Sequence, residues 1–277
     1  MHEPTIEHKL IPCWFILAIG LLISNIQSEL YFIDLFFLLT IGIFHGAYDF
    51  HYAIFSKKLD TMGQIKFILQ YVIIALAFIF FWLIYPNLGL GIFFIIASIH
   101  FGLDWDHFEN IFITSILGYA TLSISLYMHP DVTNQMLTHD FLNISPHTLL
   151  LLTSLTPVSC MLGLFFCIFH RRKVMLIQWL SFQLLGAILP PLTFFTIYFC
   201  GFHSIKHIQN MREKLNKVSG LDKMAVLLWL ISIVVLVSIH ACFKSQLNQY
   251  PLHTYFILLA GLTMPHMWLH MLPLSKN

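Results

Sequence analysis

Residues 174–209 read VMLIQWLSFQLLGAILPPLTFFTIYFCGFHSIKHIQ, an apolar stretch too long for a single membrane crossing. A bilayer core about 30 Å thick needs only about 20 apolar residues per helix. Pro190-Pro191 interrupts the stretch in its middle. Tandem proline removes backbone donors and clashes with the preceding turn of a helix. We therefore predict two membrane helices that meet at this pair.

The rest of the chain has the same apolar character. Hydrophobic residues make up 58% of the 277 residues and charged residues only 10%, whereas soluble domains carry about 25% charged residues. We predict an all-α fold, a polytopic transmembrane bundle of eight to ten helices in which residues 1–277 form a single integral membrane domain. Ten crossings are favoured, because the two halves of the split stretch come in addition to eight other apolar runs. These runs lie near residues 10–27, 30–52, 65–85, 88–105, 110–128, 147–169, 222–243 and 253–272.

The basic residues test this count. With ten crossings, thirteen of the fourteen Lys and Arg residues fall on one side of the membrane, and only Lys244 falls on the other. A single crossing over 174–209 would move the basic residues from Lys206 to Lys223 to the other side of the membrane. The excess of Lys and Arg on one side would then be much smaller. The positive-inside rule therefore favours the split, with both termini in the cytoplasm of a multi-pass protein in the cell (inner) membrane. A formal net charge of +1 gives no indication of a nucleic-acid partner.

Ionisable side chains are rare in membrane helices unless they have a function, yet this chain carries sixteen histidines. Four predicted helices carry pairs spaced four residues apart, which share one helix face. All four helices are even-numbered crossings, so all four run from the outside to the inside. Because each pair lies toward the C-terminal end of its helix, the pairs would lie at a similar depth near the cytoplasmic side. This is the arrangement expected if histidines from different helices converge on one transition-metal ion, since imidazole suits iron, copper, nickel and zinc. The pairs are His45/Asp49, His100/Asp104, His203/His207 and His266/His270.

The roles within these pairs stay open at this point. Asp49 and Asp104 could hold the second ring nitrogen of a histidine on their own helix or on a neighbouring one. His266 and His270 could be ligands, supports of ligands, or part of a substrate pocket. His51 and His107 lie beyond the motifs and are interpreted as surface groups or as groups in a layer outside the metal ligands. The remaining histidines are interpreted as interfacial or solvated side chains.

Four motifs together resemble the Brp/Blh family. They are His45-Gly46-Ala47-x-Asp49, His100-Phe101-Gly102, Tyr198-Phe199-Cys200-x-x-His203-Ser204-x-x-His207 and Pro265-His266-Met267. The family consists of bacterial and archaeal membrane β-carotene 15,15′-dioxygenases that supply retinal to rhodopsins. The motifs come in the family's order at similar separations, from the second predicted helix to the C-terminus. One departure is Phe44, where many members have proline.

The resemblance implies Fe(II) held by His45, His100, His203 and His207, with no further catalytic residue. It implies that O₂ cleaves β-carotene at the central 15,15′ double bond into two all-trans-retinal molecules, and that a rhodopsin accepts the product. Asp49, Asp104, His266 and His270 would support the ligands or line the pocket. An apolar tunnel would fix the register of a polyene that enters from the bilayer. The candidate tunnel residues are the aromatics beside the motifs, Phe44, Tyr48, Phe101, Trp105, Tyr198, Phe199, Phe202 and Trp268.

Other classes of protein remain as alternatives. A membrane di-iron hydroxylase or desaturase would also be rich in histidine, but this chain has no His-His pair and its motifs lie within helices. A divalent-metal transporter would place histidines along a hydrated route near the bilayer midplane, whereas these motifs crowd one side. A carotenoid- or retinal-binding helper without catalysis is the third alternative.

Overall fold

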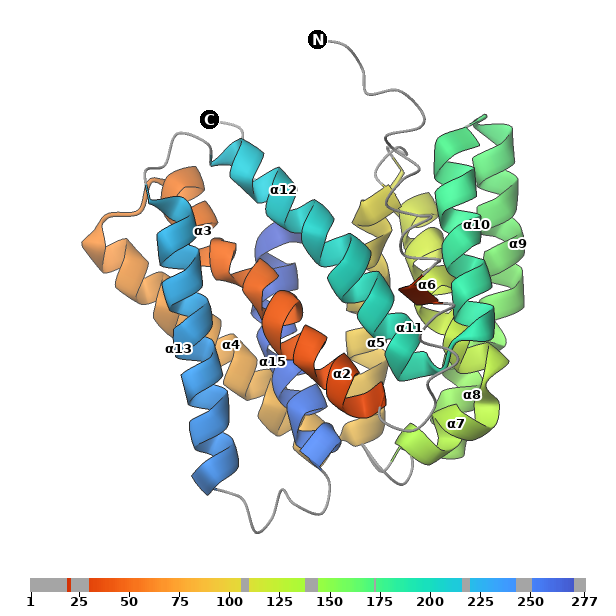
Figure 1. The fold of residues 1–277 in the computed structure, drawn as a ribbon, viewed down its shortest axis with the longest axis horizontal. Coiled ribbons are helices and arrows are strands. Elements are labelled where there is room, and N and C mark those ends of the chain that lie inside the picture. Colours follow the sequence, from red (N-terminus) through yellow and green to blue (C-terminus); the bar gives the residue numbers. More distant parts are fainter. Residues whose placement is uncertain are drawn as a thin grey trace.

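The computed structural model describes residues 19–20, 30–105, 110–137, 144–171, 173–215, 220–242 and 251–271. Every regular element in these ranges is a helix, which confirms the predicted all-α fold (Figure 1). The elements are α2 (Leu30–Phe37), η1 (Leu38–Gly42), η2 (His45–Tyr48), α3 (Asp49–Lys57), α4 (Thr61–Ile84), α5 (Pro86–Gly102), η3 (Leu103–Trp105), α6 (Ile111–Met128), α7 (Pro130–Asn134), α8 (Pro146–Ser154), α9 (Thr156–Phe169), α10 (Lys173–Ile188), α11 (Pro191–Thr196), η5 (Ile197–His203), α12 (Ser204–Lys214), α13 (Leu221–Cys242) and α15 (Pro251–Met271).

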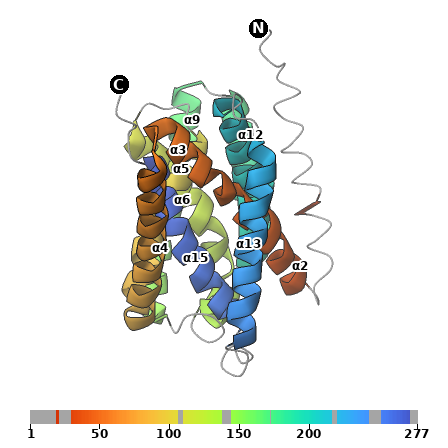
Figure 2. The same ribbon diagram turned by 90° about the vertical axis from the view of Figure 1, so that its left-hand side faces the viewer.

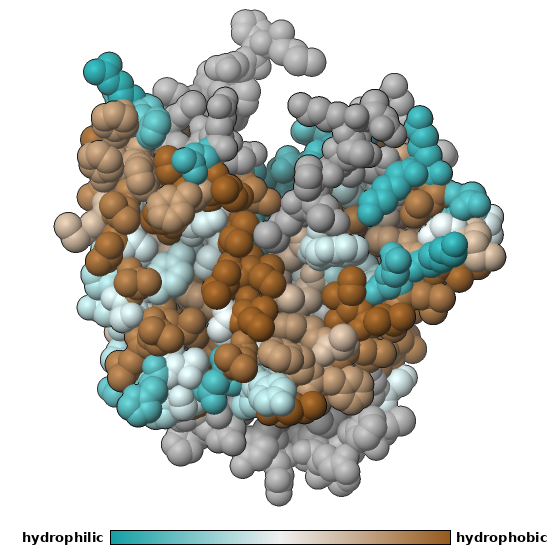
Figure 3. Space-filling model, turned by 180° about the vertical axis from the view of Figure 1, so that it is seen from behind, coloured by the Kyte–Doolittle hydropathy of each residue, from teal (hydrophilic) through white to brown (hydrophobic). Residues whose placement is uncertain are grey.

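Within the described ranges, five helical segments are long and apolar enough to cross a membrane, and each matches a predicted crossing. The first predicted crossing, near residues 10–27, lies outside the described residues except for residues 19 and 20. Apolar side chains cover the middle of one face of the molecule, as a lipid-facing surface requires (Figure 3). The five segments are Ile33–Phe55, Thr61–Ile84, Pro86–Trp105, Ile111–Met128 and Pro146–Phe169.

The chain breaks at Pro190-Pro191, as predicted. Helix α10 ends at Ile188, Pro190 is extended with ψ 152°, and Pro191 begins α11. The break frees the carbonyl of Leu189, which accepts a hydrogen bond of 2.6 Å from the Ser125 hydroxyl of α6. A buried carbonyl needs such a partner. The break gives α11, η5 and α12 a direction of their own, and Figure 1 shows α12 crossing the bundle obliquely while α10 stands upright at its side.

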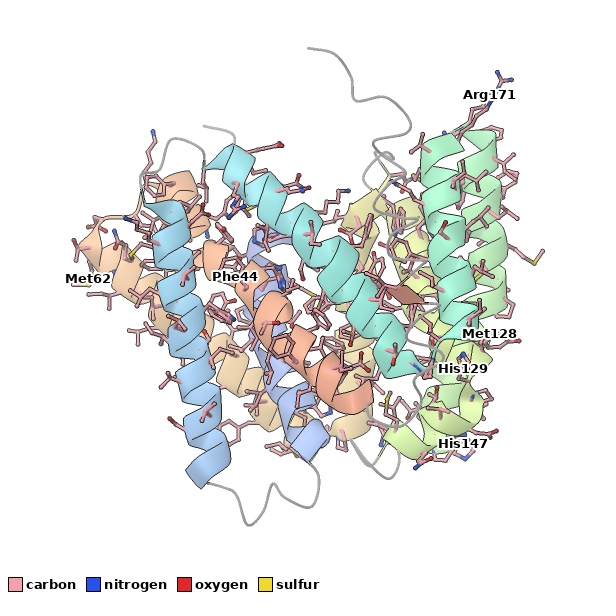
Figure 4. All side chains as sticks on the ribbon, in the orientation of Figure 1. Phe44, Met62, Met128, His129, His147 and Arg171 are labelled. Atoms are coloured by element: carbon pink, nitrogen blue, oxygen red, sulfur yellow. The ribbon has the colours of Figure 1, made fainter. Side chains whose placement is uncertain are left out.

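Two groups of helices form the walls of the bundle. On one side α6 packs against α5, α9 and α10, and on the other α4 packs against α15. The segment from α2 to η2 and the segment from α11 to α12 cross between them (Figures 1 and 2). Arg171, which follows α9, lies at the opposite end of the molecule from His129 and His147 (Figure 4). The elements that carry the histidine motifs contact one another, since α12 packs against η2 and α15 packs against α5.

Candidate metal centre

Three residues of the motifs occur where a helix changes its winding. His45 begins the 3₁₀ segment η2, directly after the π-helical η1. His203 is the last residue of the π-helical η5. Asp104 lies in the 3₁₀ segment η3, which follows α5 and His100. Single-turn π-helices and mid-helix 3₁₀ segments often mark functional sites, and the sequence pattern did not predict these changes.

The rings of the four predicted ligands lie near one another, although among the described residues no set of ligand atoms within 4.8 Å of one another contains all four. The exposed fractions of His45, His100 and His203 are 5%, 4% and 3%, and His207 is half-buried. The Nε2 atoms of His100 and His203 are 3.2 Å apart. The ring centroids of His45 and His207 are 5.5 Å apart. The cluster therefore joins side chains from η2, α5, η5 and α12.

His266 of α15 belongs to the same cluster. One ring nitrogen from each of His45, His203 and His266 lies within 4.8 Å of the other two. The His266 ring centroid is 4.7 Å from that of His45, 5.1 Å from that of His100 and 5.0 Å from that of His207. A second group, formed by His207, His266, His270 and Asp49, also places its ligand atoms within 4.8 Å of one another.

Asp104 holds a histidine of a neighbouring helix. Its Oδ2 accepts hydrogen bonds from Nδ1 of His203 over 2.9 Å and from the Tyr198 hydroxyl over 2.7 Å. The backbone carbonyl of Asp104 accepts a bond of 2.5 Å from Nζ of Lys206. The structure thus pairs Asp104 with His203 rather than with His100 on its own helix.

Asp49 connects three helices in the same way. Its carboxylate accepts hydrogen bonds from Nδ1 of His266 over 2.9 Å and from Nε2 of His270 over 3.0 Å. The Tyr71 hydroxyl of α4 donates to Oδ2 over 2.9 Å. The Asp49 side chain is only 3% exposed. A buried carboxylate needs this number of donors, so Asp49 is fully occupied by fixing side chains from α4 and α15.

These bonds determine which ring nitrogen is free. A carboxylate or a carbonyl oxygen only accepts, so Nδ1 carries the proton in His203 and His266, and also in His45, where Nδ1 donates to the carbonyl of Gly42. In a neutral ring Nε2 then presents its lone pair. Nε2 of His45, His207 and His266 is buried without a hydrogen-bond partner among the described residues. Each such orphan costs about 1–3 kcal/mol.

A transition-metal ion would satisfy these nitrogens, so the residues present fit one. Imidazole is a good ligand for iron, copper, nickel and zinc, and a poor one for magnesium and calcium. Two nitrogens bound to one such ion at about 2.1 Å lie about 3.0–3.4 Å apart. The Nε2 atoms of His100 and His203, 3.2 Å apart, have that spacing.

The aromatic residues predicted to form the tunnel lie in several places. Phe101 and Phe199 line one small cavity, and Tyr198 lines another of about 80 Å³. Trp105 stacks on Phe202 with ring centroids 5.5 Å apart. The three other predicted tunnel residues lie apart from these. Phe44 packs edge-to-face on Tyr48, whose hydroxyl donates to Asp222. Trp268 is 45% exposed.

The sequence pattern missed a larger cavity of about 270 Å³ beside the cluster. His45, Asp49, Tyr71 and His266 form its inner wall, and mostly apolar residues of α4, α13, α15 and the segment from η1 to α3 form the rest. Figure 2 shows α15 lying behind α4 and α13. The outer wall consists of side chains that are about half exposed on the apolar surface, Ile68 (46%), Val72 (47%) and Ile231 (50%). The cavity is therefore bordered by the lipid-facing surface between α4 and α13. Helices α4 and α13 carry no motif, and Tyr71 was the one polar signal on α4 beside this cavity.

Comparison with known proteins identifies the family of the chain. A family model described as beta-carotene 15,15′-dioxygenase matches residues 36–272. A beta-carotene 15,15′-dioxygenase of the uncultured marine bacterium 66A03 is 28% identical over 248 residues, which cover 82% of this chain and 88% of that protein. No solved structure matches the chain. The family match spans all four histidine motifs, and the chain belongs to the β-carotene 15,15′-dioxygenase family of oxygenases.

Proposed function

We propose that this protein cleaves β-carotene with O₂ at the central 15,15′ double bond and releases two molecules of all-trans-retinal. The observation that carries the proposal is the buried histidine cluster, in which three Nε2 atoms have no hydrogen-bond partner among the described residues, in a chain of this family. The protein would act as a single integral domain over residues 1–277 of the cell (inner) membrane, and a rhodopsin would accept the retinal. The apolar helices and the strongly apolar cavity support a lipid-soluble substrate.

Iron(II) is the metal that we assign, with His45, His100, His203 and His207 as its ligands. Bound iron would supply the activation of O₂ that the cleavage requires. The protein's own contribution is to fix the imidazoles. Asp104 holds the proton on Nδ1 of His203 and so directs Nε2 into the cluster. The Gly42 carbonyl does the same for His45.

The cavity beside the cluster is the proposed substrate chamber. A hydrocarbon dissolved in the bilayer would enter between α4 and α13, past Val72 and Ile231, without crossing water. The chamber reaches His45 and His266, so one end of a polyene would rest against α4 and α13 while its middle lies at the cluster.

The other end of the polyene would extend beyond the cluster into two smaller cavities. Leu259 and Thr263 line both the chamber and the small cavity of Phe101 and Phe199. That cavity in turn shares three phenylalanines with the cavity of about 80 Å³ that Tyr198 lines, namely Phe93, Phe195 and Phe256. Walls on both sides of the cluster would fix the register of a long polyene, and with it the bond that is cleaved. Three of the predicted tunnel residues, Phe101, Tyr198 and Phe199, belong to this path.

The experiment is expression in a bacterium that accumulates β-carotene, followed by chromatography of the extracted pigments. We expect retinal to appear as β-carotene falls. His203→Ala should abolish both changes, whereas His147→Ala, an exposed residue at the far end of the bundle, should leave them intact (Figure 4). Hydroxylated carotenoids in place of retinal would instead favour a hydroxylase. Unchanged pigment with the iron-loaded protein present in the membrane would refute the proposal.

A further inference from the structure

The Asp49 and Asp104 sites have the same construction. Each carboxylate accepts one bond from a tyrosine hydroxyl and one from Nδ1 of a histidine on another element: Tyr198 and His203 at Asp104, Tyr71 and His266 at Asp49. Both Nδ1–Oδ2 distances are 2.9 Å. A tyrosine and a carboxylate together fix a ring orientation and a tautomer, as the partners around a metal-binding histidine do. His266 is therefore held in the way that His203 is held.

The free nitrogen of His266 lacks any protein partner among the described residues. Nδ1 is occupied by Asp49, and Nε2 is buried without a hydrogen bond. The side chain is 2% exposed, so water cannot reach it freely. A histidine that only packed in the core would be expected to have hydrogen-bond partners for its buried nitrogens. His266 instead has Nδ1 fixed and Nε2 unpaired among the described residues.

His266 also has the most central position in the cluster. Its ring lies within about 5 Å of the rings of His45, His100, His207 and His270. It belongs to both groups of side chains whose ligand atoms lie within 4.8 Å of one another. Its helix can come this close because Gly261, five residues earlier, packs against Ile79 of α4, where a Cβ atom would overlap the isoleucine side chain.

We propose that Nε2 of His266 is a fifth nitrogen ligand of the metal ion. The inference rests on the proposed function, which places the ion among His45, His100, His203 and His207. Five neutral imidazoles with no carboxylate would favour a late first-row divalent ion. They would leave one position of a six-coordinate ion open, beside the chamber that His45 and His266 line. Asp49 and Tyr71 would then be positioning residues that act through His266.

The test is metal binding by the full-length protein purified in detergent, with Co²⁺ as a spectroscopic probe. The visible bands of Co²⁺ intensify as its coordination number falls. We expect the wild-type protein to bind one Co²⁺ ion. Since loss of a residue that only supports a ligand weakens metal affinity by about 10–100-fold, His266→Ala should weaken it by at least that factor and should intensify the bands. Added imidazole, held by Asp49 in the vacated space, should reverse the spectral change. His147→Ala should bind and absorb like the wild type.

The outcomes separate this inference from the proposed function. If His203→Ala loses Co²⁺ while His266→Ala keeps the wild-type affinity and spectrum, His266 is not a ligand, although the metal centre stands. If the wild-type protein binds no Co²⁺ or iron, both fail. Should His266→Ala not fold, as judged by circular dichroism and gel filtration, His266→Gln preserves side-chain volume and polarity without the imidazole. The same loss of affinity and spectral change is then expected, and wild-type values overturn the inference.

Discussion

Nδ1 of His203 donates to Oδ2 of Asp104 over 2.9 Å, although 99 residues separate the two along the chain. His203 ends the π-helical η5, and Asp104 lies in the 3₁₀ segment after α5. Both side chains are buried, at 3% and 8% exposed. The bond joins two elements at the cluster and leaves Nε2 of His203 facing Nε2 of His100.

Asp104→Asn should reduce retinal formation and metal affinity, each by about 10–100-fold. The amide is neutral and carries donors of its own, so it stabilises the His203 tautomer and the Tyr198 hydroxyl less well than the carboxylate does. The measurement is iron content after purification, together with the rate of retinal formation.

Asp60→Ala is the matched control, since this aspartate caps α4 by accepting from the amide of Gly63 and lies outside the cluster. It should cost about 1 kcal/mol of helix stability and leave metal content unchanged. Wild-type iron content and activity in Asp104→Asn would remove the aspartate from the proposed support of His203.

Val72→Trp should slow retinal formation about tenfold, which corresponds to about 1.4 kcal/mol. Val72 lines the chamber and is 47% exposed, so an indole there would narrow the proposed route from the bilayer. Metal content should not change. The neighbouring residue Ile73 does not line the chamber and is 62% exposed, so Ile73→Trp should have no effect on either quantity. Equal rates in the two variants would place the substrate route elsewhere.

The sequence predicted the features that depend on local pattern. Apolar runs predicted the all-α fold, and Pro190-Pro191 predicted the break that the structure shows between Ile188 and Pro191. The spacing of His203 and His207 predicted a shared helix face, and their ring centroids are 6.3 Å apart. Each of these features needs only the geometry of one segment.

The features that depend on packing between segments were not predictable. The spacing of His100 and Asp104 allowed a bond within one helix, and only the approach of η5 shows that Asp104 binds His203 instead. The chamber lies against α4 and α13, whose residues Val72 and Ile231 resemble any other lipid-facing side chains in sequence. The predicted tunnel residues are aromatic residues beside the motifs. That criterion could not identify the outer wall of the chamber, which is contributed by helices without a motif.

Gly118→Leu should destabilise the bundle by about 1–3 kcal/mol. A Cβ atom at Gly118 of α6 would overlap the carbonyl oxygen of Ser98 and would lie 2.5 Å from the backbone nitrogen of Gly102. Backbone cannot move aside as a flexible side chain can, so α5 and α6 would have to separate. Thermal unfolding in detergent measures the effect.

Gly91→Ala provides the comparison, because a Cβ atom there meets nothing within 4 Å and the residue lies inside α5. Alanine should raise stability by about 0.5–1 kcal/mol, since it favours a helix more than glycine does. An unchanged melting temperature for Gly118→Leu would contradict the close packing of α5 against α6, and a fall for Gly91→Ala would contradict the open space at that residue.

Removing the metal should lower both activity and thermal stability. An ion that binds only the folded protein stabilises it by about 2.7 kcal/mol when its free concentration is one hundred times Kd. Without the ion, Nε2 of His45, His207 and His266 is buried with no partner in the part of the chain that the structure describes. We expect a chelator to lower the melting temperature and to stop retinal formation, and added Fe(II) to restore both. In His203→Ala the chelator should no longer shift the melting temperature, because the ion is already absent. A wild-type melting temperature that chelation leaves unchanged would show that the cluster is held together without a metal.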